Sequence, residues 1–273
     1  MSDASVVVVT YNAMPWVEHA LASVRGNETV VVDHGSTDGT VAFVRERFPD
    51  VPVVEEENRG LAYGWNTGVA RTSGRYVLLL NADAWMHDGA LDELVAFADT
   101  HARAAVVAPR LQNQDGTLQR SVRGFPTVWR IATEYLFLRK LAPRSQALNA
   151  FYAGGFAHDE AREADWIMGA VWLVRRAAVD EVGPADDGFF LFSEETDWAY
   201  RFHEAGWQVW FDPAAAATHV YGGSHQGRLL AENVRGQLRF LRKHHGRATA
   251  TAARWVMVAG LLLRCRLDVV RSL

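Results

Sequence analysis

The stretch RYVLLLNAD, residues 75–83, holds the most apolar strand that the sequence predicts, Arg75–Leu80, and this strand stops at Asn81-Ala82-Asp83. A short, nearly continuous apolar run is typical of a strand that is buried on both faces of a parallel sheet. Three further runs of this kind lie upstream, at Val6–Thr10, Thr29–Val32 and Val51–Val54. Together these strands indicate a parallel sheet at the centre of the fold.

Helical patterns separate the four strands. Apolar residues recur at helical spacing over Trp16–Val24, Val41–Phe48 and Leu61–Ala70. Strands and helices that alternate in this way predict an α/β fold with a mostly parallel central sheet. In such a sheet the ligand-binding loops follow the carboxyl ends of the strands, so we expect the functional site there.

The next part of the chain combines a hairpin with single strands and helices. Asp115-Gly116 separates two strand-like runs, a pattern that predicts a β-hairpin. The expected elements are strands at Val106–Gln112, Thr117–Val122 and Trp166–Val174, helices at Ala177–Val182 and Glu195–Ala205, and a strand at Trp207–Asp212. Residues 126–163 carry mixed helix and loop signals that assign no element.

The chain has 273 residues, of which 49% are hydrophobic, and a formal net charge of −4. This length and apolar content suit one large α/β domain, and they exclude a disordered chain or a coiled coil. Cys265 is the single cysteine. One cysteine makes neither an internal disulfide nor a cysteine-based zinc site, which favours a reducing, cytoplasmic location.

Charge is distributed unevenly along the chain. Residues 1–226 carry 18 basic and 30 acidic side chains, a balance of −12, whereas residues 227–273 carry 10 basic and 2 acidic side chains, a balance of +8. We therefore divide the chain into an α/β domain, residues 1–226, and a basic, apolar helical C-terminal extension, residues 227–273. The acidic domain argues against nucleic-acid binding, and the basic extension suits an anionic surface.

The C-terminal extension contains an apolar run, Ala248–Leu263, which is 16 residues long and includes Arg254. A membrane-spanning helix needs about 20 apolar residues, so this run is too short to span a bilayer. Three alternatives are open for it. It could lie in an anionic membrane interface, pack against a second copy in a homodimer, or cover the core of its own chain.

No glycine-rich nucleotide motif accompanies the strands. Neither Gly-x-Gly-x-x-Gly nor Gly-x-x-x-x-Gly-Lys-Ser/Thr follows a strand. Polar groups follow three strand ends instead: Thr10-Tyr11-Asn12, Asp33-His34-Gly35-Ser36 and Asn81-Ala82-Asp83. Because neighbouring parallel strands end at one crevice, these groups form the candidate binding site.

Five segments in this order resemble the family 2 glycosyltransferases of GT-A fold. They are Val-Val-Thr10-Tyr11-Asn12, residues 32–40 (VDHGSTDGT), Asn58-Arg59-Gly60 with Asn66-Thr67-Gly68, Arg75–Asp83, and Phe190–Arg201. The chain is most similar to the bacterial rhamnosyltransferase-like branch, which shares Pro109-Arg110-Leu111 before an Asp-Gly hairpin and a Phe-Pro pair after it. The resemblance covers about residues 5–225, and it implies an enzyme that transfers a hexose.

The resemblance also implies a nucleotide-sugar site at the strand ends. The residues expected to contact the donor are Thr10, Tyr11, Asn12, Asp33, Gly60, Asn66, Asn81 and Ala82. Asp33 would accept a hydrogen bond from the imide of a pyrimidine base, and Thr10 and Tyr11 would line the base and ribose. The alternative for Asp33 is helix capping or turn formation, a role that suits Asp38 better.

The Asp-x-Asp metal motif of the family corresponds here to Asn81-Ala82-Asp83. Asp83 keeps the negative charge that Mg²⁺ or Mn²⁺ requires, while Asn81 can bond a ribose hydroxyl or a metal-bound water. Similar enzymes have a further metal ligand at the position of His219, and imidazole suits Mn²⁺ better than Mg²⁺. The resemblance therefore implies a divalent cation held by Asp83 and His219 against the donor diphosphate.

The acidic run Glu194-Glu195-Thr196-Asp197 begins an expected helix, where acidic residues are favoured in any case. Transfer with inversion needs a general base that takes the proton of the acceptor hydroxyl. By its position in the motif Glu195 is the candidate base, although the family usually has Asp there. The residues expected to contact the acceptor or the donor sugar are Trp166, Gly169, Glu194 and Asp197, with a core position the alternative for Trp166.

These expectations describe an inverting, metal-dependent glycosyltransferase of cell-wall polysaccharide synthesis. The donor would be a dTDP-sugar or UDP-sugar, first of all dTDP-rhamnose, and the acceptor a saccharide or lipid-linked saccharide at the inner face of the membrane. One alternative is a nucleotidylyltransferase, but the Gly-rich basic loop of that class is missing after the first strand. The other is a nucleotide-sugar-binding protein without transfer activity, against which the joint presence of Asp83, Glu195 and His219 argues.

Overall fold

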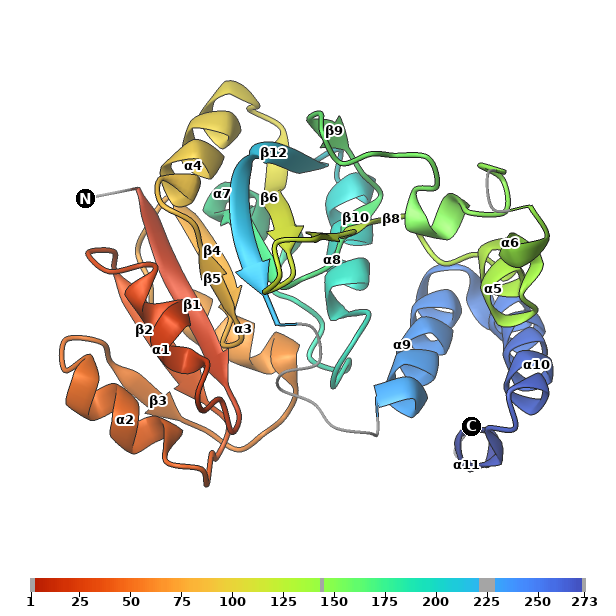
Figure 1. Cartoon of the computed structure of the whole chain (residues 1–273), viewed down its shortest axis with the longest axis horizontal. Coiled ribbons are helices and arrows are strands. Elements are labelled where there is room, and N and C mark those ends of the chain that lie inside the picture. Colours follow the sequence, from red (N-terminus) through yellow and green to blue (C-terminus); the bar gives the residue numbers. More distant parts are fainter. Residues whose placement is uncertain (1–2, 143–144, 221–228, 272–273) are drawn as a thin grey trace.

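The computed structural model describes residues 3–142, 145–220 and 229–271. Within this part, a ten-stranded sheet forms the centre and helices cover both of its faces (Figure 1). Its strands are β1 (Ala4–Thr10), β2 (Thr29–Asp33), β3 (Val53–Glu55), β4 (Tyr76–Asn81), β5 (Ala84–Met86), β6 (Ala104–Gln112), β7 (Leu118–Gln119), β9 (Arg162–Glu163), β11 (Val171–Arg175) and β12 (Gln208–His219).

The strands follow one another across the sheet in the order β3-β2-β1-β4-β11-β6-β12-β5, with β7 paired to β6 and β9 paired to β12. β11 runs antiparallel to both of its neighbours, β4 and β6, while β1 to β4 are parallel to one another and β6 is parallel to β12. The mostly parallel α/β sheet that the sequence predicts is therefore confirmed. A separate two-stranded sheet pairs β8 (Val122–Arg123) with β10 (Trp166–Ile167).

Side chains of the central strands alternate between two hydrophobic cores, which explains why these strands are apolar throughout. In β4, Leu78 and Leu80 belong to one core, and Val77 and Leu79 belong to the other. The first core is covered by α1 (Val17–Ala22), α2 (Thr40–Arg47) and α4 (Ala90–Thr100), and the second by α3 (Leu61–Val69), α7 (Arg176–Val182) and α8 (Glu194–Glu204).

The C-terminal extension forms a helical hairpin at the end of the molecule opposite to β3 (Figure 1). Its helices are α9 (Leu229–His244), α10 (Gly246–Leu263) and α11 (Leu267–Val270). Their apolar side chains, such as Phe240 and Met257, share a third core with Ile131 of α5 (Val128–Tyr135). Of the three alternatives for Ala248–Leu263, the structure thus shows the one in which it covers the core of its own chain. The boundary predicted between residues 226 and 227 lies outside the described residues.

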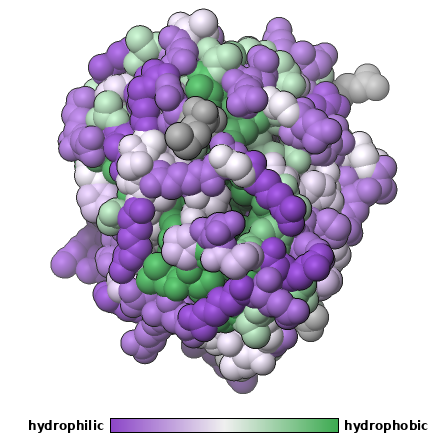
Figure 2. Space-filling view, turned by 90° about the vertical axis from the view of Figure 1, so that its left-hand side faces the viewer, coloured by the Kyte–Doolittle hydropathy of each residue, from purple (hydrophilic) through white to green (hydrophobic). Residues whose placement is uncertain are grey.

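Exposed apolar side chains are concentrated on this hairpin. Four of the eight large apolar residues that are exposed in the described part belong to α10 and α11, namely Trp255, Leu262, Leu263 and Leu267. The opposite end of the molecule presents mostly hydrophilic residues, with hydrophobic patches between them (Figure 2). No helix in the described ranges has both the length and the apolar character needed to cross a membrane.

Two predicted strands differ from the structure in ways that shape the site. The single strand predicted at Trp166–Val174 is wrong, because the chain turns at Met168-Gly169-Ala170, where the Ala170 N–H donates to the Met168 carbonyl oxygen over 2.9 Å. β10 therefore stays outside the main sheet, and only β11 enters it. The strand predicted at Trp207–Asp212 continues through an irregular register to His219.

Several elements lack a counterpart in the sequence prediction. The short strand β5 follows Asp83 directly, and residues 126–163 contain α5 together with α6 (Leu138–Leu141) and the 3₁₀ helix η1 (Ala150–Tyr152). β5 pairs with the end of β12, so Asp83 and His219 reach the same edge of the sheet.

Candidate active site

The carboxyl ends of β1, β2 and β4 lie next to one another, as the sequence predicts. Thr10 of β1 pairs with Asp33 of β2, and Val9 pairs with Asn81 of β4. The three polar strand ends therefore border one crevice, which is the position expected for a ligand in a parallel sheet.

Asp33 is completely buried, and its carboxylate accepts hydrogen bonds from Thr10 of β1 and from the loop that follows Asp33. Oδ2 accepts hydrogen bonds from Thr10 Oγ1 (2.7 Å) and Ser36 Oγ (2.5 Å), and Oδ1 accepts from the backbone N–H groups of Gly35 (3.0 Å) and Ser36 (2.8 Å). This geometry favours the turn-forming alternative for Asp33. Its contact with a pyrimidine base stays a prediction.

Tyr11 and Asn12 lie at the rim of the same loop. Tyr11 is 45% exposed and is accessible to a ligand. Asn12 has a left-handed backbone (φ 52°), its Oδ1 accepts from the Thr37 N–H over 2.8 Å, and its own N–H donates to Ser36 Oγ over 2.8 Å. Asn12 therefore joins the loops after β1 and β2.

Gly60 and Asn66 contact the segment that leads into α8. Gly60 has a φ of +102°, and a Cβ atom at this position would lie 2.4 Å from the carbonyl oxygen of Phe190. Asn66 Nδ2 donates to the Ala185 carbonyl oxygen over 2.8 Å, and Asn66 Oδ1 accepts from the Ala185 N–H over 3.0 Å. Their contacts with the nucleotide sugar stay predictions, since the observed contacts are with the protein itself.

Asp83 and His219 come together across the pairing of β5 with β12. Both residues are buried, and Asp83 Oδ1 lies 3.5 Å from His219 Nε2. Across the described ranges, no three His, Cys, Asp or Glu side chains form a group that could hold a metal ion. A divalent cation does not require three, because one or two protein ligands together with substrate phosphate oxygens commonly complete its coordination.

Gln119, which the sequence interpretation missed, orients the ring of His219. Gln119 Nε2 donates to Asn113 Oδ1 over 2.9 Å, so its Oε1 faces His219 Nδ1 at 2.7 Å. In the neutral ring the proton is therefore on Nδ1, and the lone pair of Nε2 faces the carboxylate of Asp83. An oriented imidazole and a carboxylate that face each other fit the divalent cation implied by the resemblance. The only sequence signal for Gln119 is its place in the predicted hairpin.

A cavity of about 430 Å³ lies beside this pair. Six of the predicted site residues line it: Asn81, Trp166, Gly169, Glu194, Glu195 and His219. The predicted residues that do not line it are Thr10, Tyr11, Asn12, Asp33, Gly60, Asn66, Ala82, Asp83 and Asp197. Trp166 is half-buried in its wall, where its indole N–H donates to the Gly124 carbonyl oxygen over 2.9 Å. Arg123, Arg130 and Tyr152 also line the cavity, and no sequence motif had pointed to them.

Glu195 is buried in this cavity at the start of α8, and its Oε2 has no hydrogen-bond partner among the described residues. Burial raises the pKa of the Glu195 carboxyl to about 7, although backbone N–H groups, among them that of Gly169, act in the opposite direction. Burial and the charge of Glu195 also raise the pKa of Glu194 well above its usual range. A carboxyl group with a pKa near neutrality suits a general base.

The backbone before Glu194 has an unusual conformation. Phe192 (φ 67°) and Ser193 (φ 68°) are consecutive left-handed residues, which is rare without glycine and frequent at functional sites. On the other side of Glu195, a Cβ atom on Gly169 would lie 3.3 Å from Glu195 Cβ. The position of the Glu195 side chain is therefore set by the loop before α8 and by the Gly169 turn.

Asp197 joins α8 to the C-terminal hairpin. Its fully buried Oδ1 accepts from His244 Nε2 and Lys243 Nζ, both at 2.7 Å, and its Oδ2 accepts from Arg201 Nε at 3.0 Å. Burial alone would raise the pKa of Asp197, but the hydrogen bonds from His244 and Lys243 outweigh burial and lower it. The geometry favours an orienting role for Asp197 over a contact with the acceptor.

The central sheet and the helical layers on both of its faces define an α/β fold of the GT-A class. Within that class the chain belongs to glycosyltransferase family 2, because the model of the family described as "Glycosyl transferase family 2" matches residues 5–159, more than half of the chain.

A relative of similar length supports the rhamnosyltransferase-like branch. The chain is 29% identical to the N-acetylglucosaminyl-diphospho-decaprenol L-rhamnosyltransferase of Mycobacterium tuberculosis, over 98% of this chain and 93% of the relative. It is 25% identical to the poly-beta-1,6-N-acetyl-D-glucosamine synthase of Staphylococcus epidermidis, over 77% of this chain and 48% of the relative. The chain is thus a glycosyltransferase.

Solved structures share the fold. The mannosyltransferase PcManGT from Pyrobaculum calidifontis, in complex with GDP-Man and Mn²⁺, aligns with a TM-score of 0.59 and 19% identity, over 96% of this chain and 75% of that one. GalNAc-T7 with UDP, GalNAc and Mn²⁺ aligns with a TM-score of 0.61 and 17% identity, over 88% of this chain and 47% of that one. The predicted GT-A fold is therefore confirmed.

Proposed function

We propose that this enzyme transfers rhamnose with inversion from dTDP-rhamnose to a saccharide carried on a lipid diphosphate, in a reaction that depends on a divalent cation. The observation that carries the proposal is Glu195, a buried carboxyl with a pKa of about 7 in the wall of a cavity. The likeness to a rhamnosyltransferase over nearly the whole chain supports the sugar and the class of acceptor.

In this proposal Glu195 accepts the proton of the acceptor hydroxyl. The acceptor oxygen then bonds to the anomeric carbon from the side opposite to the leaving diphosphate, which inverts the configuration. Trp166 offers an aromatic face to a sugar ring, and its bond to Gly124 fixes the plane of that face. A divalent cation held by Asp83 and His219 would neutralise the charge that develops on the diphosphate.

Two structural neighbours support a nucleotide donor and a divalent cation for this chain. One was solved with GDP-Man and the other with UDP and GalNAc, each with Mn²⁺. In this chain the pair formed by Asp83 and His219 offers ligands for such a cation, and the polar strand ends offer groups for such a nucleotide.

The test combines donors, cations and one acceptor. The purified protein is incubated with a prenyl-diphospho-N-acetylglucosamine and with dTDP-rhamnose, UDP-N-acetylglucosamine or GDP-mannose, each in Mn²⁺, Mg²⁺ or EDTA. We expect a product heavier by one deoxyhexose, formed from dTDP-rhamnose and only with a divalent cation. Transfer from another donor alone would refute the assignment of the sugar, and full activity in EDTA would refute the cation dependence. Glu195→Gln serves as the control for a contaminating transferase.

The exposed apolar side chains of α10 and α11 support a peripheral position of this enzyme on an anionic membrane face. The variant Trp255→Ser/Leu263→Ser tests this, because both side chains are exposed and make little contact with the core. We expect the parent protein to float with phosphatidylglycerol vesicles and the variant to float less. Equal flotation would refute the membrane contact, and a halved solution mass of the variant would point to a homodimer instead.

A further inference from the structure

A second hollow, which the proposed mechanism does not use, runs between α9, α10 and the loop before α8. It is an open groove of about 1080 Å³. Six cationic side chains line it: Arg235, Arg239, Arg242, Lys243, Arg247 and Arg254. Glu232 is the one acidic residue in its lining. The groove is therefore strongly cationic, although the chain as a whole carries a net charge of −4.

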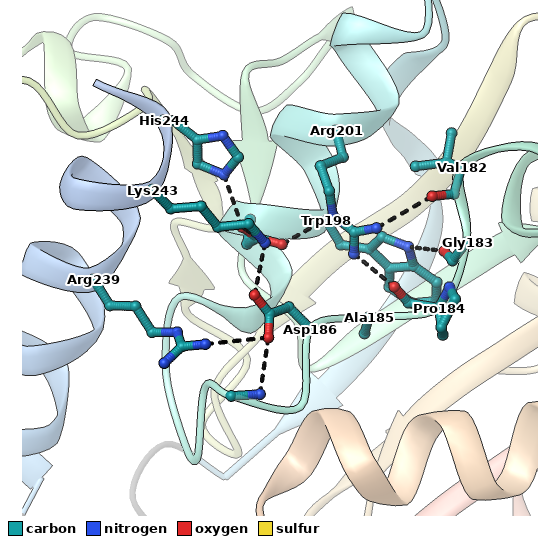
Figure 3. Close-up of polar contacts among 12 residues, drawn as sticks. Val182, Gly183, Pro184, Ala185, Asp186, Trp198, Arg201, Arg239, Lys243 and His244 are labelled. Carbon is teal, nitrogen blue, oxygen red and sulfur yellow. Dashed lines mark hydrogen bonds and ion pairs between the residues drawn. The ribbon is translucent and has the colours of Figure 1, made fainter. Parts of the chain in front are cut away.

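Acidic side chains of this protein neutralise only part of the positive charge of the groove. Arg235 pairs with Glu232 (2.5 Å), and Arg239 and Lys243 pair with Asp186 (3.4 and 2.6 Å; Figure 3). In the ranges that the structure describes, three groove residues form no ion pair, namely Arg242, Arg247 and Arg254. These three guanidinium groups are exposed, and together they favour an occupant with more than one negative charge.

The spacing on α10 suits phosphate groups. Arg247 and Arg254 are seven residues apart, so they lie on one face of the helix and about 10 Å apart along its axis. The lining residues between them, Ala250 and Thr251, are small and leave room for a ligand. Guanidinium groups bind phosphate oxygens through two parallel hydrogen bonds, and several of them along one groove favour a diphosphate over a single carboxylate.

The groove shares a wall with the cavity of Glu195. Leu191 and Phe192 line both hollows. Gly236 of α9 packs against this wall, since a Cβ atom there would lie 2.7 Å from the carbonyl oxygen of Phe192. A diphosphate in the groove would thus be separated from the base by one loop, and it would lie beside α9 and not at the strand ends, where the donor is expected.

Apolar side chains lead away from the groove. Phe190, which lines it, is 49% exposed. Trp255 follows Arg254 directly, and Leu262 lies seven residues further along the same face of α10, with exposed fractions of 66% and 49%. A hydrocarbon chain attached to a diphosphate in the groove would meet these side chains.

We infer that the groove between α9 and α10 binds the diphosphate of the lipid-linked acceptor. The saccharide then reaches over Leu191 and Phe192 to Glu195, and the prenyl chain follows α10. The inference rests on the proposed function, because it takes the acceptor to be a saccharide on a lipid diphosphate. A diphosphate esterified at both ends carries two negative charges, whereas a phosphatidylglycerol headgroup carries one.

Binding of farnesyl diphosphate to the full chain in EDTA tests the groove without any transfer reaction. Calorimetric titration should show binding by the parent protein. The variant Arg247→Gln/Arg254→Gln should bind at least about 10-fold more weakly, because the loss of even one contact between a guanidinium and a phosphate costs about a factor of ten. The variant Arg45→Gln/Arg271→Gln removes the same charge from exposed sites outside the groove, and it should bind like the parent.

Three results would overturn the inference. Equal affinity of parent and groove variant, at equal urea midpoints, would show that the arginines do not hold the ligand. Displacement of farnesyl diphosphate by dTDP would place the ligand in the donor crevice. Complete displacement by phosphatidylglycerol vesicles would assign the groove to membrane lipid.

A transfer assay separates this inference from the proposed function. The groove variant should raise the KM for a prenyl-diphospho-saccharide about 10-fold and leave the KM for an alkyl glycoside of the same sugar unchanged. An equal rise for both acceptors would overturn the inference. A parent protein that binds farnesyl diphosphate as described but transfers no sugar would refute the proposed function and support the groove.

Discussion

Replacement of Asp197 by Asn tests the ionic link between α8 and the C-terminal hairpin. The buried carboxylate of Asp197 accepts hydrogen bonds from Arg201, Lys243 and His244 at 2.7 to 3.0 Å. Removing one charge of a buried ion pair costs about 3–5 kcal/mol of the free energy of unfolding, because the partner charges stay behind uncompensated. Lys243 keeps its pair with Asp186 and Arg201 keeps two backbone carbonyls, so we expect the lower end, about 3 kcal/mol.

The effect of Asp197→Asn should depend on pH. The pKa of Asp197 is lowered in the folded protein, so its stabilisation is present above the pKa of an unfolded aspartate and is lost as the pH falls through the folded value. The difference in the free energy of unfolding between parent and variant should therefore be constant near pH 7 and shrink below about pH 4.

Urea unfolding, followed by circular dichroism, measures this difference. Asp268→Asn is the control, since it removes a carboxylate that pairs with Arg266 in the same C-terminal extension but is 64% exposed, and it should leave the midpoint unchanged. A loss below about 1 kcal/mol for Asp197→Asn, the range of an exposed pair, would refute the reasoning. A raised acceptor KM with an unchanged urea midpoint would instead give Asp197 a role in acceptor binding.

Four further predictions concern the chemistry. Glu195→Gln should lower kcat about 100-fold or more and leave the Kd of the donor nucleotide unchanged, and a variant with most of its rate would exclude Glu195 as the base. In the parent, kcat/KM should rise with pH and level off above about pH 7, because the raised pKa keeps the Glu195 carboxyl protonated below pH 7. A profile of kcat/KM that is flat from pH 5 to 8 would contradict this prediction. Asp83→Ala should abolish turnover and weaken dTDP binding in Mn²⁺ but not in EDTA, and parent-like binding in Mn²⁺ would place the cation elsewhere. Gln119→Leu should weaken Mn²⁺ binding, measured by electron paramagnetic resonance, by about 10-fold to 100-fold, whereas an unchanged affinity would show that the ring of His219 needs no orienting partner.

The first half of the fold could be predicted because its signals are local. β1, β2 and β4 are apolar on both faces, so each strand is recognisable from its own residues, and the polar groups after them mark the crevice. The same reasoning failed at Trp166–Val174, where the apolar pattern continues through the turn at Gly169. At that turn Gly169 packs closely against Glu195 and Trp65, and this packing depends on residues far away in the sequence.

For the candidate site, too, the residues marked by local motifs could be predicted, and their distant partners could not. The motifs predicted Glu195, Asp83 and His219, which the structure places at one end of the sheet. The partners that orient them could not be found in this way, because Gln119 lies 100 residues from His219 in the sequence. The sequence also does not indicate Lys243 and His244 as partners of Asp197, because this contact forms only when the C-terminal hairpin packs against α8.

The contacts of Lys243 and His244 with the carboxylate of Asp197 have a consequence for any shortened form of this enzyme. Asp197 follows Glu195 by two residues on α8, and His244 reaches it from 47 residues further along the chain. A protein that ended before α9 would lose two of the cations that neutralise Asp197, together with the helix that packs on this carboxylate. Such a protein would be impaired at the helix of the base itself, so its inactivity would say nothing about anchorage or substrate capture. Only exchanges of individual side chains can separate these roles.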